Sequence, residues 1–456
     1  MGAHTQLPPL AVMRYTKGTM KGKSAAITEE TRGKKIPKVP TVPFPTEKEI
    51  LEAIEHTVKG KDQDATIKLF EKIMIYGHGI RASDVHLEPW KDHGIIRIRV
   101  DGILHDSFTL PALTHQELIA RLKILTRMRT DEHHGPQDGR FAFNSPLGNV
   151  DVRASILPDT NGEKAVLRLL SSQSHQLSLE ELGFAPEDLA RVERAIKKPW
   201  GMILATGPTG SGKTTTIYAI LEILNKREVN IASIEDPVEF EIPGANQSQV
   251  DHVAKLTFAT GLRALLRQDP DIIMVGEIRD EETAKIAVNA AMTGHKLLST
   301  LHTNNSATTI PRLIDMNVEP FLISSTFLCA IAQRLLRRVC DSCKTTAELT
   351  KEEATAILNT ETATAIFATA KADKITIAKA NGCEKCTNTG YRGRVGIYEV
   401  LENSPTIQEL IARRATSEEI EDQARKEGMT TVAEDGAKKV IAGLTTIEEL
   451  ARVMQE

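Results

Sequence analysis

Residues 204–216, LATGPTGSGKTTT, decide the fold of this 456-residue chain. A short apolar run at 202–205 leads into this stretch, and residues 214–224 continue it with helical composition. The pattern therefore predicts a strand, a glycine-rich loop and the start of a helix. Consecutive backbone N–H groups of such a loop surround an anion that bulky side chains would exclude. The stretch thus predicts a phosphate-binding loop in an α/β sheet.

The loop matches the pattern G-x-x-x-x-G-K-[ST]. We expect Lys213 to reach the β- and γ-phosphates of a nucleotide, and the Thr214 hydroxyl to hold Mg²⁺. Because kinases, GTPases and motors share this pattern, other motifs must separate these classes. The residues predicted to contact the nucleotide are Gly207, Pro208, Thr209, Gly210, Ser211, Gly212, Lys213, Thr214 and Thr215.

The composition is typical of a soluble globular protein, with 41% hydrophobic residues, 26% charged residues and a formal net charge of −4. Because positive and negative charge nearly cancel, the chain carries no overall electrostatic footprint for nucleic acid. No run approaches the roughly 18 apolar residues of a membrane span, and the N-terminus lacks a secretory apolar segment. We expect the chain to stay in the cytoplasm.

Residues 1–46 are basic and end in several prolines, a composition that predicts a disordered tail and a stiff linker. The tail is either solvated without a role or contacts an anionic membrane surface or an acidic partner. Residues 47–170 predict a smaller α+β domain, and the polar segment 171–178 predicts an interdomain linker. The predicted elements of the smaller domain include helices at 47–58, 65–76 and 116–127 and a hairpin that turns at 101–102.

Two arginines of the α+β domain are expected to lie side by side. If residues 144–149 close a hairpin, Arg140 faces Arg153, and the apolar residues of both strands share the opposite face. Like charges directly opposite are destabilising, so the pair predicts an anion that arrives from elsewhere. A slip of two residues keeps the same faces and leaves two ordinary surface arginines as the alternative.

Acidic and histidine side chains follow three apolar runs after the phosphate loop. Glu235 and Asp236 end the first run, Glu277 follows the second, and His302 follows the third. Nucleotide sites of α/β sheets lie at such carboxyl ends, and carboxylates beside phosphate act on Mg²⁺ or on water. Glu277 is the predicted residue that polarises the attacking water. The alternatives are surface acids at the ends of strands and a structural histidine.

Four of the five cysteines form two C-x-x-C pairs, Cys340 with Cys343 and Cys383 with Cys386. This pattern suits a metal site in a reducing compartment better than a disulfide framework. Four thiolates favour tetrahedral Zn²⁺ with no open position, so the predicted zinc is structural. The 39 residues between the pairs, 344–382, exceed the usual spacing of a zinc ribbon.

Eight motifs occur in one order from about residue 83 onward: SDVHLEP, IRIRVDG, QDGRF, GEKAVLRLL, GPTGSGKTTT, SIEDPVE, QDPDIIMVGEIRD and TGHKLLSTLHTN. In this order they resemble the assembly ATPases of type II secretion and type IV pili, a family of hexameric motors. The resemblance implies that the nucleotide is ATP and that Glu277 is the catalytic glutamate. It places Glu235 and Glu239 in the acidic box and His295 and His302 in the histidine box of the family.

The resemblance also gives Arg140 and Arg153 a role, because they match arginines that the family's N-terminal domain swings onto the nucleotide phosphates. The expected fold is a RecA-like P-loop ATPase core preceded by a smaller α+β, PAS-like domain. A tetracysteine zinc subdomain and a helical C-terminal part follow. The expected bounds are 47–170 for the α+β domain, 179–335 for the core, 336–395 for the zinc subdomain and 396–456 for the helical part.

The family resemblance implies a homohexamer at the cytoplasmic face of the inner membrane. An inner-membrane platform protein and cytoplasmic assembly proteins are the expected partners, and no nucleic acid is expected. Two alternatives remain, a nucleic-acid translocase with the same core and a catalytically silent nucleotide-binding scaffold. The sequence departs from the family in two places: the basic tail stands where many members have a further folded domain, and Lys296 occupies a usually apolar strand position.

Overall fold

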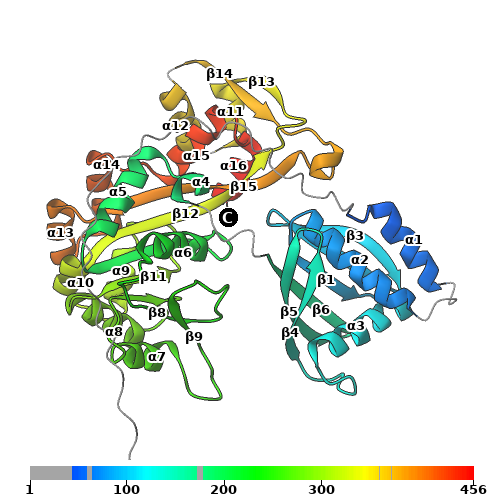
Figure 1. The fold of residues 1–456 in the computed structure, drawn as a ribbon. Coiled ribbons are helices and arrows are strands. Elements are labelled where there is room, and N and C mark those ends of the chain that lie inside the picture. The colour runs from blue at the N-terminus through cyan, green and yellow to red at the C-terminus, as the bar shows by residue number, and fades with distance from the viewer. Residues whose placement is uncertain (1–43, 59–63, 172–177, 359, 371, 456) are drawn as a thin grey trace, which may run out of the picture. The chain divides into compact units, whose positions relative to one another are not determined.

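The structure is a computed structural model that describes residues 44–58, 64–171, 178–358, 360–370 and 372–455 (Figure 1). Residues 1–43 of the predicted basic tail and residues 172–177 of the predicted linker lie outside the described residues. Among the residues that are described, no helix is long and apolar enough to cross a membrane.

The amino-terminal part folds into α1 (Glu47–Val58), α2 (Ala65–Gly79), β1 (Ala82–Pro89), β2 (His93–Val100), β3 (Ile103–Pro111), α3 (Ala112–Thr126), β4 (Gln137–Ser145), β5 (Gly148–Asp159) and β6 (Gly162–Ser171). Its six strands form an antiparallel sheet in the order β3-β2-β1-β6-β5-β4. Apolar side chains of the three helices and of the sheet share one buried cluster. The predicted hairpin at 101–102 is confirmed, because Val100 pairs with Ile103 across that turn.

The register of β4 and β5 agrees with the sequence prediction, since Arg140 pairs with Arg153. Val150 and Val152 are buried in the amino-terminal cluster. The turn is tighter than expected, because the ladder continues to Ser145 and Gly148 and leaves only residues 146–147 to close the hairpin. The alternative register with a slip of two residues is therefore excluded.

The core contains α4 (Leu179–Leu182), α5 (Pro186–Lys197), β7 (Gly201–Thr206), α6 (Lys213–Leu224), β8 (Ile231–Glu235), β9 (Ala245–Gln249), α7 (Phe258–Leu265), β10 (Ile272–Val275), α8 (Glu281–Met292), β11 (Lys296–Leu301), α9 (Thr309–Asp315), α10 (Pro320–Thr326), β12 (Phe327–Val339) and β15 (Tyr391–Glu402). Its seven-stranded sheet has the order β15-β12-β7-β11-β10-β8-β9. Every neighbouring pair is parallel except β12 with β15. The carboxyl ends of the parallel strands therefore meet at one edge of the sheet.

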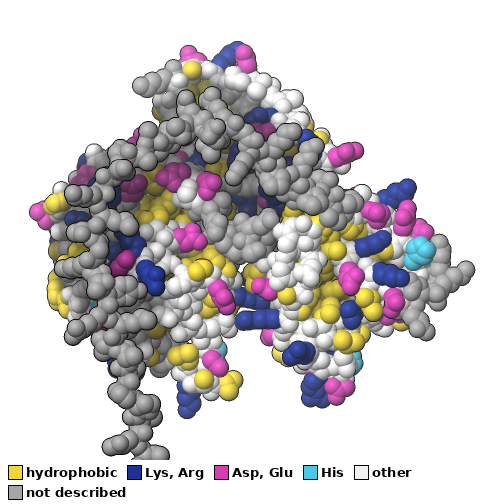
Figure 2. Space-filling view, in the orientation of Figure 1, with side chains coloured by type: hydrophobic (Ala, Val, Ile, Leu, Met, Phe, Trp, Pro, Cys, Tyr) yellow, Lys and Arg dark blue, Asp and Glu magenta, His cyan; other side chains and the backbone are white. Residues whose placement is uncertain are grey.

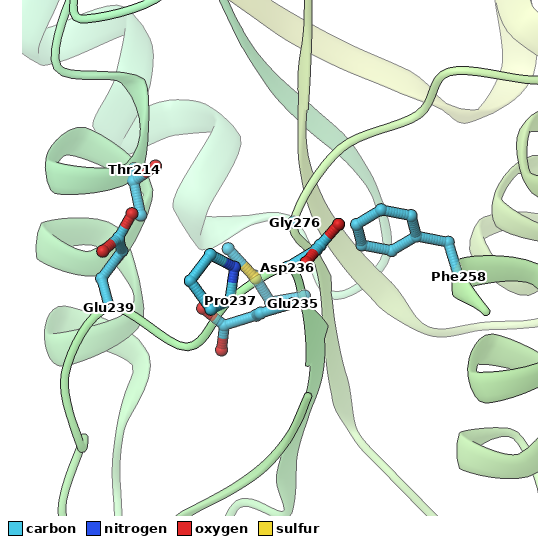
Figure 3. Close-up of a pocket in the computed structure, with 8 residues that line it drawn as sticks. Thr214, Glu235, Asp236, Pro237, Glu239, Phe258 and Gly276 are labelled. Atoms are coloured by element: carbon cyan, nitrogen blue, oxygen red, sulfur yellow. The ribbon is translucent and has the colours of Figure 1, made fainter. Parts of the chain in front are cut away.

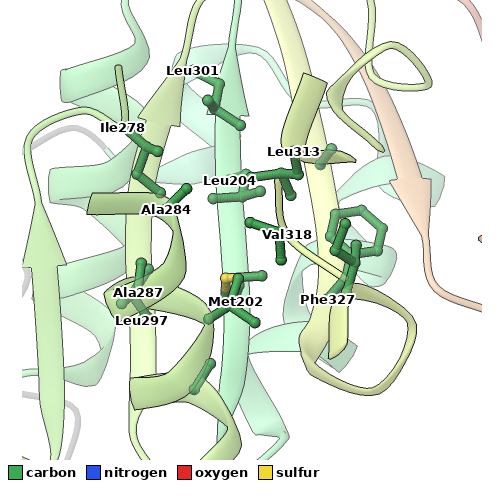
Figure 4. Close-up of a cluster of buried hydrophobic side chains, with 14 of the residues drawn as sticks. Met202, Leu204, Ile278, Ala284, Ala287, Leu297, Leu301, Leu313, Val318 and Phe327 are labelled. Atoms are coloured by element: carbon green, nitrogen blue, oxygen red, sulfur yellow. The ribbon is translucent and has the colours of Figure 1, made fainter. Parts of the chain in front are cut away.

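Both faces of the core sheet are covered by helices, as a parallel sheet requires. Along β7, Met202 and Leu204 point into one buried cluster with residues of α7, α8 and α9. Figure 4 shows the α8 and α9 side of this cluster. Ile203 and Ala205 point into a second cluster with α4, α5 and α6. Each large side chain buried in this way stabilises the fold by roughly 1.5–3 kcal/mol. This packing makes β7 a rigid base for the phosphate loop.

The remaining elements are β13 (Thr345–Thr350), α11 (Lys351–Ile357), α12 (Thr360–Ala370), β14 (Lys374–Lys379), the 3-10 turn η2 (Glu384–Cys386), α13 (Pro405–Ala412), α14 (Ser417–Lys426), α15 (Val432–Ile441) and α16 (Ile447–Gln455). The predicted helical C-terminal part is confirmed from α13 onward. The segment between the two cysteine pairs contains the antiparallel strand pair β13 and β14, which α11 and α12 separate in the chain. Figure 2 shows acidic and basic side chains interspersed over the visible face.

Candidate nucleotide-binding site

The phosphate loop joins the end of β7 to the start of α6, and its glycines adopt conformations that other residues avoid. Gly207, Gly210 and Gly212 have φ angles of 144°, 82° and 89°, where a side chain would be strained. A Cβ atom on Gly207 would also lie 2.6 Å from the Gln333 carbonyl oxygen and 2.7 Å from Ser211 Oγ. The loop therefore requires glycine for its backbone and for its packing.

Lys213 occupies the first position of α6 and is only 8% exposed. Its ammonium donates to the carbonyl oxygens of Gly207 at 2.8 Å and Pro208 at 3.0 Å. Burial lowers the pKa of Lys213 to about 8, the Arg334 charge acts in the same direction, and the Glu277 carboxylate opposes both. A phosphate bound at this helix N-terminus would favour the charged ammonium.

Glu277 follows β10 and lies beside the end of β11. Its carboxylate pairs with Arg279 and has one oxygen 3.4 Å from His302 Nε2. Burial lowers the pKa of His302, and the nearby Lys213 charge adds to this effect, so the neutral imidazole is favoured at pH 7. The structure thus brings Lys213, Glu277 and His302 together, although they come from three separate motifs.

Glu235 ends β8 and is 2% exposed. Its carboxylate accepts hydrogen bonds from Ser233 Oγ at 2.5 Å, from Gln247 Nε2 at 3.1 Å and from the Tyr218 hydroxyl. A buried carboxylate needs such donors because it has lost its water. Glu235 therefore also joins β8 to α6 and β9.

Thr214, Glu235, Asp236 and Glu239 line a cavity of about 50 Å³ beside the phosphate loop. Figure 3 shows Thr214 at the start of α6 and Glu239 on the segment that follows β8. Hydroxyl and carboxylate oxygens are the ligands that Mg²⁺ prefers. The side chains at this position therefore fit the predicted magnesium ion.

The two histidines of the predicted histidine box lie at opposite ends of β11. His302 follows the carboxyl end, whereas His295 precedes the strand and its carbonyl accepts from the Gly201 N–H at 3.1 Å. The His295 ring lies 2.9 Å from the Ala290 carbonyl oxygen, at the end of α8. Within this chain, the structure does not bring His295 to the phosphate loop, contrary to the expected nucleotide contact.

The predicted arginine pair extends to a third arginine, because Arg153 also pairs with Arg168 on β6. Sequence reasoning missed Arg168, although the alternation in GEKAVLRLL could have placed it on the same polar face. Arg153 donates to the Val238 carbonyl and lies 3.5 Å from a Glu239 oxygen, and Arg140 donates to Gln249 at 3.3 Å. These acceptors belong to the segment that follows β8 and to β9.

Two further residues beside the phosphate loop were not predicted. Gln333 donates from its side-chain amide to the Ser211 carbonyl at 2.7 Å, and Arg334 donates to the Asn304 carbonyl at 2.9 Å. Both residues lie on β12, the neighbour of β7, after the apolar residues 331–332. No signal in the sequence pointed to them, because β12 continues to Val339 and the two residues lie inside the strand, level with the end of the shorter neighbour β7.

The four predicted metal ligands come together at the ends of β12 and η2. The sulfur atoms of Cys340, Cys343, Cys383 and Cys386 all lie within 4.8 Å of one another, with close pairs at 3.6, 3.8 and 3.9 Å. Zn–S bonds of about 2.3 Å in a tetrahedron separate neighbouring sulfurs by about 3.8 Å. N–H groups of Cys383 and Gly390 also point at the Cys386 sulfur, each at 3.3 Å. The cluster fits a closed four-thiolate zinc site.

Comparisons with known proteins agree with this geometry. The family model described as "Type II/IV secretion system protein" matches residues 59–452. Type II secretion system protein E of Pseudomonas aeruginosa is 43% identical over 404 residues, which are 88% of this chain and 78% of that protein. The type IV pilus assembly ATPase PilB of Myxococcus xanthus is 42% identical over 407 residues, which are 88% of this chain and 70% of that protein.

Among solved structures, the pilus retraction motor PilT with bound ADP has 26% sequence identity and a TM-score of 0.56. The match covers 83% of this chain and 95% of that chain. The family match and the sequence identities show that this chain belongs to the type II/IV secretion system protein family.

Proposed function

We propose that this chain is a motor that hydrolyses ATP to drive pilin or pseudopilin assembly, in type IV pilus biogenesis or in type II secretion. One observation carries this proposal: a buried carboxylate, Glu277, lies beside His302 and within the field of Lys213 at the edge of the core sheet. The names of the similar proteins, a pilus assembly ATPase and a secretion system protein, supply the process.

Glu277 is the proposed residue that orients water for attack on the γ-phosphate. A water molecule held by this carboxylate can transfer a proton to it as the new P–O bond forms, while the bond from the γ-phosphorus to the bridging oxygen breaks and ADP leaves. His302 would keep the carboxylate in place, and Lys213 would stabilise negative charge that develops on the phosphate oxygens. Mg²⁺ bound with the nucleotide would neutralise further phosphate charge, and Thr214, Glu235 and Glu239 are its proposed protein neighbours.

Arg140 and Arg153 are proposed to complete the site from the amino-terminal sheet. Neighbouring guanidinium groups repel each other, and a triphosphate would relieve that repulsion. If they engage the phosphates only when the two parts of the chain close, hydrolysis is linked to a movement between these parts. Such a movement is the proposed output of the motor.

The motor is proposed to act as a homohexamer in the cytoplasm, at the inner face of the inner membrane. A membrane platform protein and cytoplasmic assembly proteins of the same machinery are the proposed partners. The zinc ion is proposed to be structural, since its four thiolates leave no position for a substrate.

A complementation experiment tests this function. In a strain that lacks the native gene, the wild-type chain should restore surface filaments or secretion of substrate proteins, and Glu277→Gln should not. Glu241→Gln, which changes an exposed acid of the core, is the matched control and should restore the phenotype. Full restoration by Glu277→Gln would instead support the nucleotide-bound scaffold.

A further inference from the structure

The middle of β12 carries two polar residues, Gln333 and Arg334, for which the proposed function has no role. Because β12 runs parallel to β7 with Ala332 opposite Thr206, both residues lie level with the first positions of the phosphate loop. Gln333 is 1% exposed, and its amide donates to the Ser211 carbonyl. Gln333 therefore holds the phosphate loop from its β12 side.

Arg334 makes contacts in more than one direction. One terminal nitrogen, Nη2, donates to the Asn304 carbonyl at 2.9 Å, and the other, Nη1, donates to the Gln333 carbonyl at 3.1 Å. Nη1 would also lie 3.2 Å from a Cβ atom on Gly207. The planar guanidinium can make these contacts together because its donors point in fixed, different directions. Arg334 thus joins β12 to the loop that follows β11, and its guanidinium lies beside Gly207 of the phosphate loop.

The loop that follows β11 is also tied to the phosphate loop at the end of β7. The Thr206 hydroxyl donates to the Thr303 carbonyl and accepts from the Thr303 N–H, both at 3.0 Å. The residue before Thr303 is His302, whose ring lies 3.4 Å from Glu277. A shift of the backbone at Asn304 would therefore move the histidine that contacts the proposed catalytic carboxylate.

We propose that Arg334 is a positioning residue for ATP hydrolysis, which holds the loop after β11 against the phosphate loop so that His302 stays beside Glu277. This inference rests on the proposed ATPase activity. The competing role for Arg334 is a simple positive charge near the phosphates. The two roles differ in a measurable way, because a lysine supplies the charge but not the fixed directions of the guanidinium donors.

The experiment compares Arg334→Lys with the wild-type chain in full length. Calorimetry with a non-hydrolysable ATP analogue gives the affinity, and steady-state ATP hydrolysis gives kcat. We expect Arg334→Lys to keep the affinity within about threefold and to lower kcat by at least about tenfold, since misplaced catalytic groups cost turnover rather than binding. Arg338→Lys, at an exposed position of the same strand, is the control and should leave both values unchanged.

A second variant guards against an unfolded product. Thr206→Val removes the hydroxyl that joins the same two loops, and it should lower kcat with little change in affinity. Retained affinity in either variant shows that the site is folded. Full turnover in Arg334→Lys, or a loss of affinity with unchanged kcat, would overturn the inference. A wild-type chain without hydrolysis would instead overturn the proposed function, and the inference with it.

Discussion

Lys296 is a buried lysine at the first position of β11, where an apolar residue was expected. Its ammonium donates to the carbonyl oxygens of Ala195, Ile196 and Lys198 at the end of α5, and it is 4% exposed. The last carbonyls of a helix lack partners within the helix, so Lys296 acts as a C-terminal cap supplied by a distant strand. No pattern in the sequence could reveal this, because the partners are backbone atoms about 100 residues earlier.

Lys296→Met should therefore destabilise the fold although methionine fits an apolar strand. Leaving these buried carbonyl oxygens without a donor should lower the free energy of unfolding by about 1–3 kcal/mol. Urea denaturation followed by far-UV circular dichroism measures this loss. Lys197→Met, at a side chain that is 74% exposed at the end of the same helix, should change the stability by less than about 0.5 kcal/mol. Equal urea midpoints of unfolding for the two variants would show that the Lys296 cap does not stabilise the fold.

At the scale of elements, the strands and their ends were largely predictable and the contacts between them were not. The alternation of apolar residues around Arg140 and Arg153 gave the inward faces of both strands but left a slip of two residues open, because such a slip keeps the same faces. The structure decides the register by pairing Arg140 with Arg153. The closeness of Glu277 and His302 followed from the rule that parallel strands end at one edge. The roles of Gln333 and Arg334 required the strand order, which places β12 beside β7, and no local pattern encodes that order.

Asp188 of α5 is a buried acid next to α15, and it predicts a pH-dependent stability. Burial raises the pKa of Asp188 to about 6, Asp435 adds to this shift, and Arg191 opposes it. The folded state therefore holds the proton of the Asp188 carboxyl more tightly than the unfolded state does. The contribution of this proton to the free energy of unfolding falls as pH rises from about 4 to about 6.

Asp188→Asn removes the charge and keeps an acceptor for the Arg191 guanidinium, which donates to Asp188 Oδ1 at 3.0 Å. The free energy of unfolding of the variant minus that of the wild type should therefore rise by about 1–2 kcal/mol from pH 5 to pH 8. Thermal melts of both proteins at the two pH values test this, since all other titrating groups are common to both. A stability difference between the two proteins that stays constant with pH would contradict the predicted titration of Asp188.

The cysteine cluster predicts a stoichiometric zinc ion. Elemental analysis of the purified chain should find about one zinc per chain, and Cys386→Ser should lose most of it because a hydroxyl is a poor zinc ligand. Cys329→Ala is the control, since Cys329 is a buried residue of the core outside the cluster, and it should retain the metal. Equal zinc content in Cys386→Ser and wild type would contradict the site.

At the scale of the whole molecule, the proposed active site uses residues of both the amino-terminal sheet and the core. Arg140→Gln and Arg153→Gln should each reduce ATP turnover by about tenfold or more and change nucleotide affinity much less, because their proposed role is to stabilise transition-state charge. Arg129→Gln, in the same part of the chain at a side chain that is 70% exposed, serves as the control. Normal turnover in both variants would show that the site is complete without these arginines.

The most direct test of the central claim, hydrolysis of ATP at the carboxyl edge of the core sheet, is the turnover of Glu277→Gln measured together with its ATP affinity. The amide keeps the shape of the carboxylate but accepts protons poorly. We predict that Glu277→Gln binds ATP as the wild type does and that its steady-state release of phosphate falls by at least about a hundredfold. Turnover at the wild-type rate would contradict the account, because hydrolysis would then not depend on Glu277.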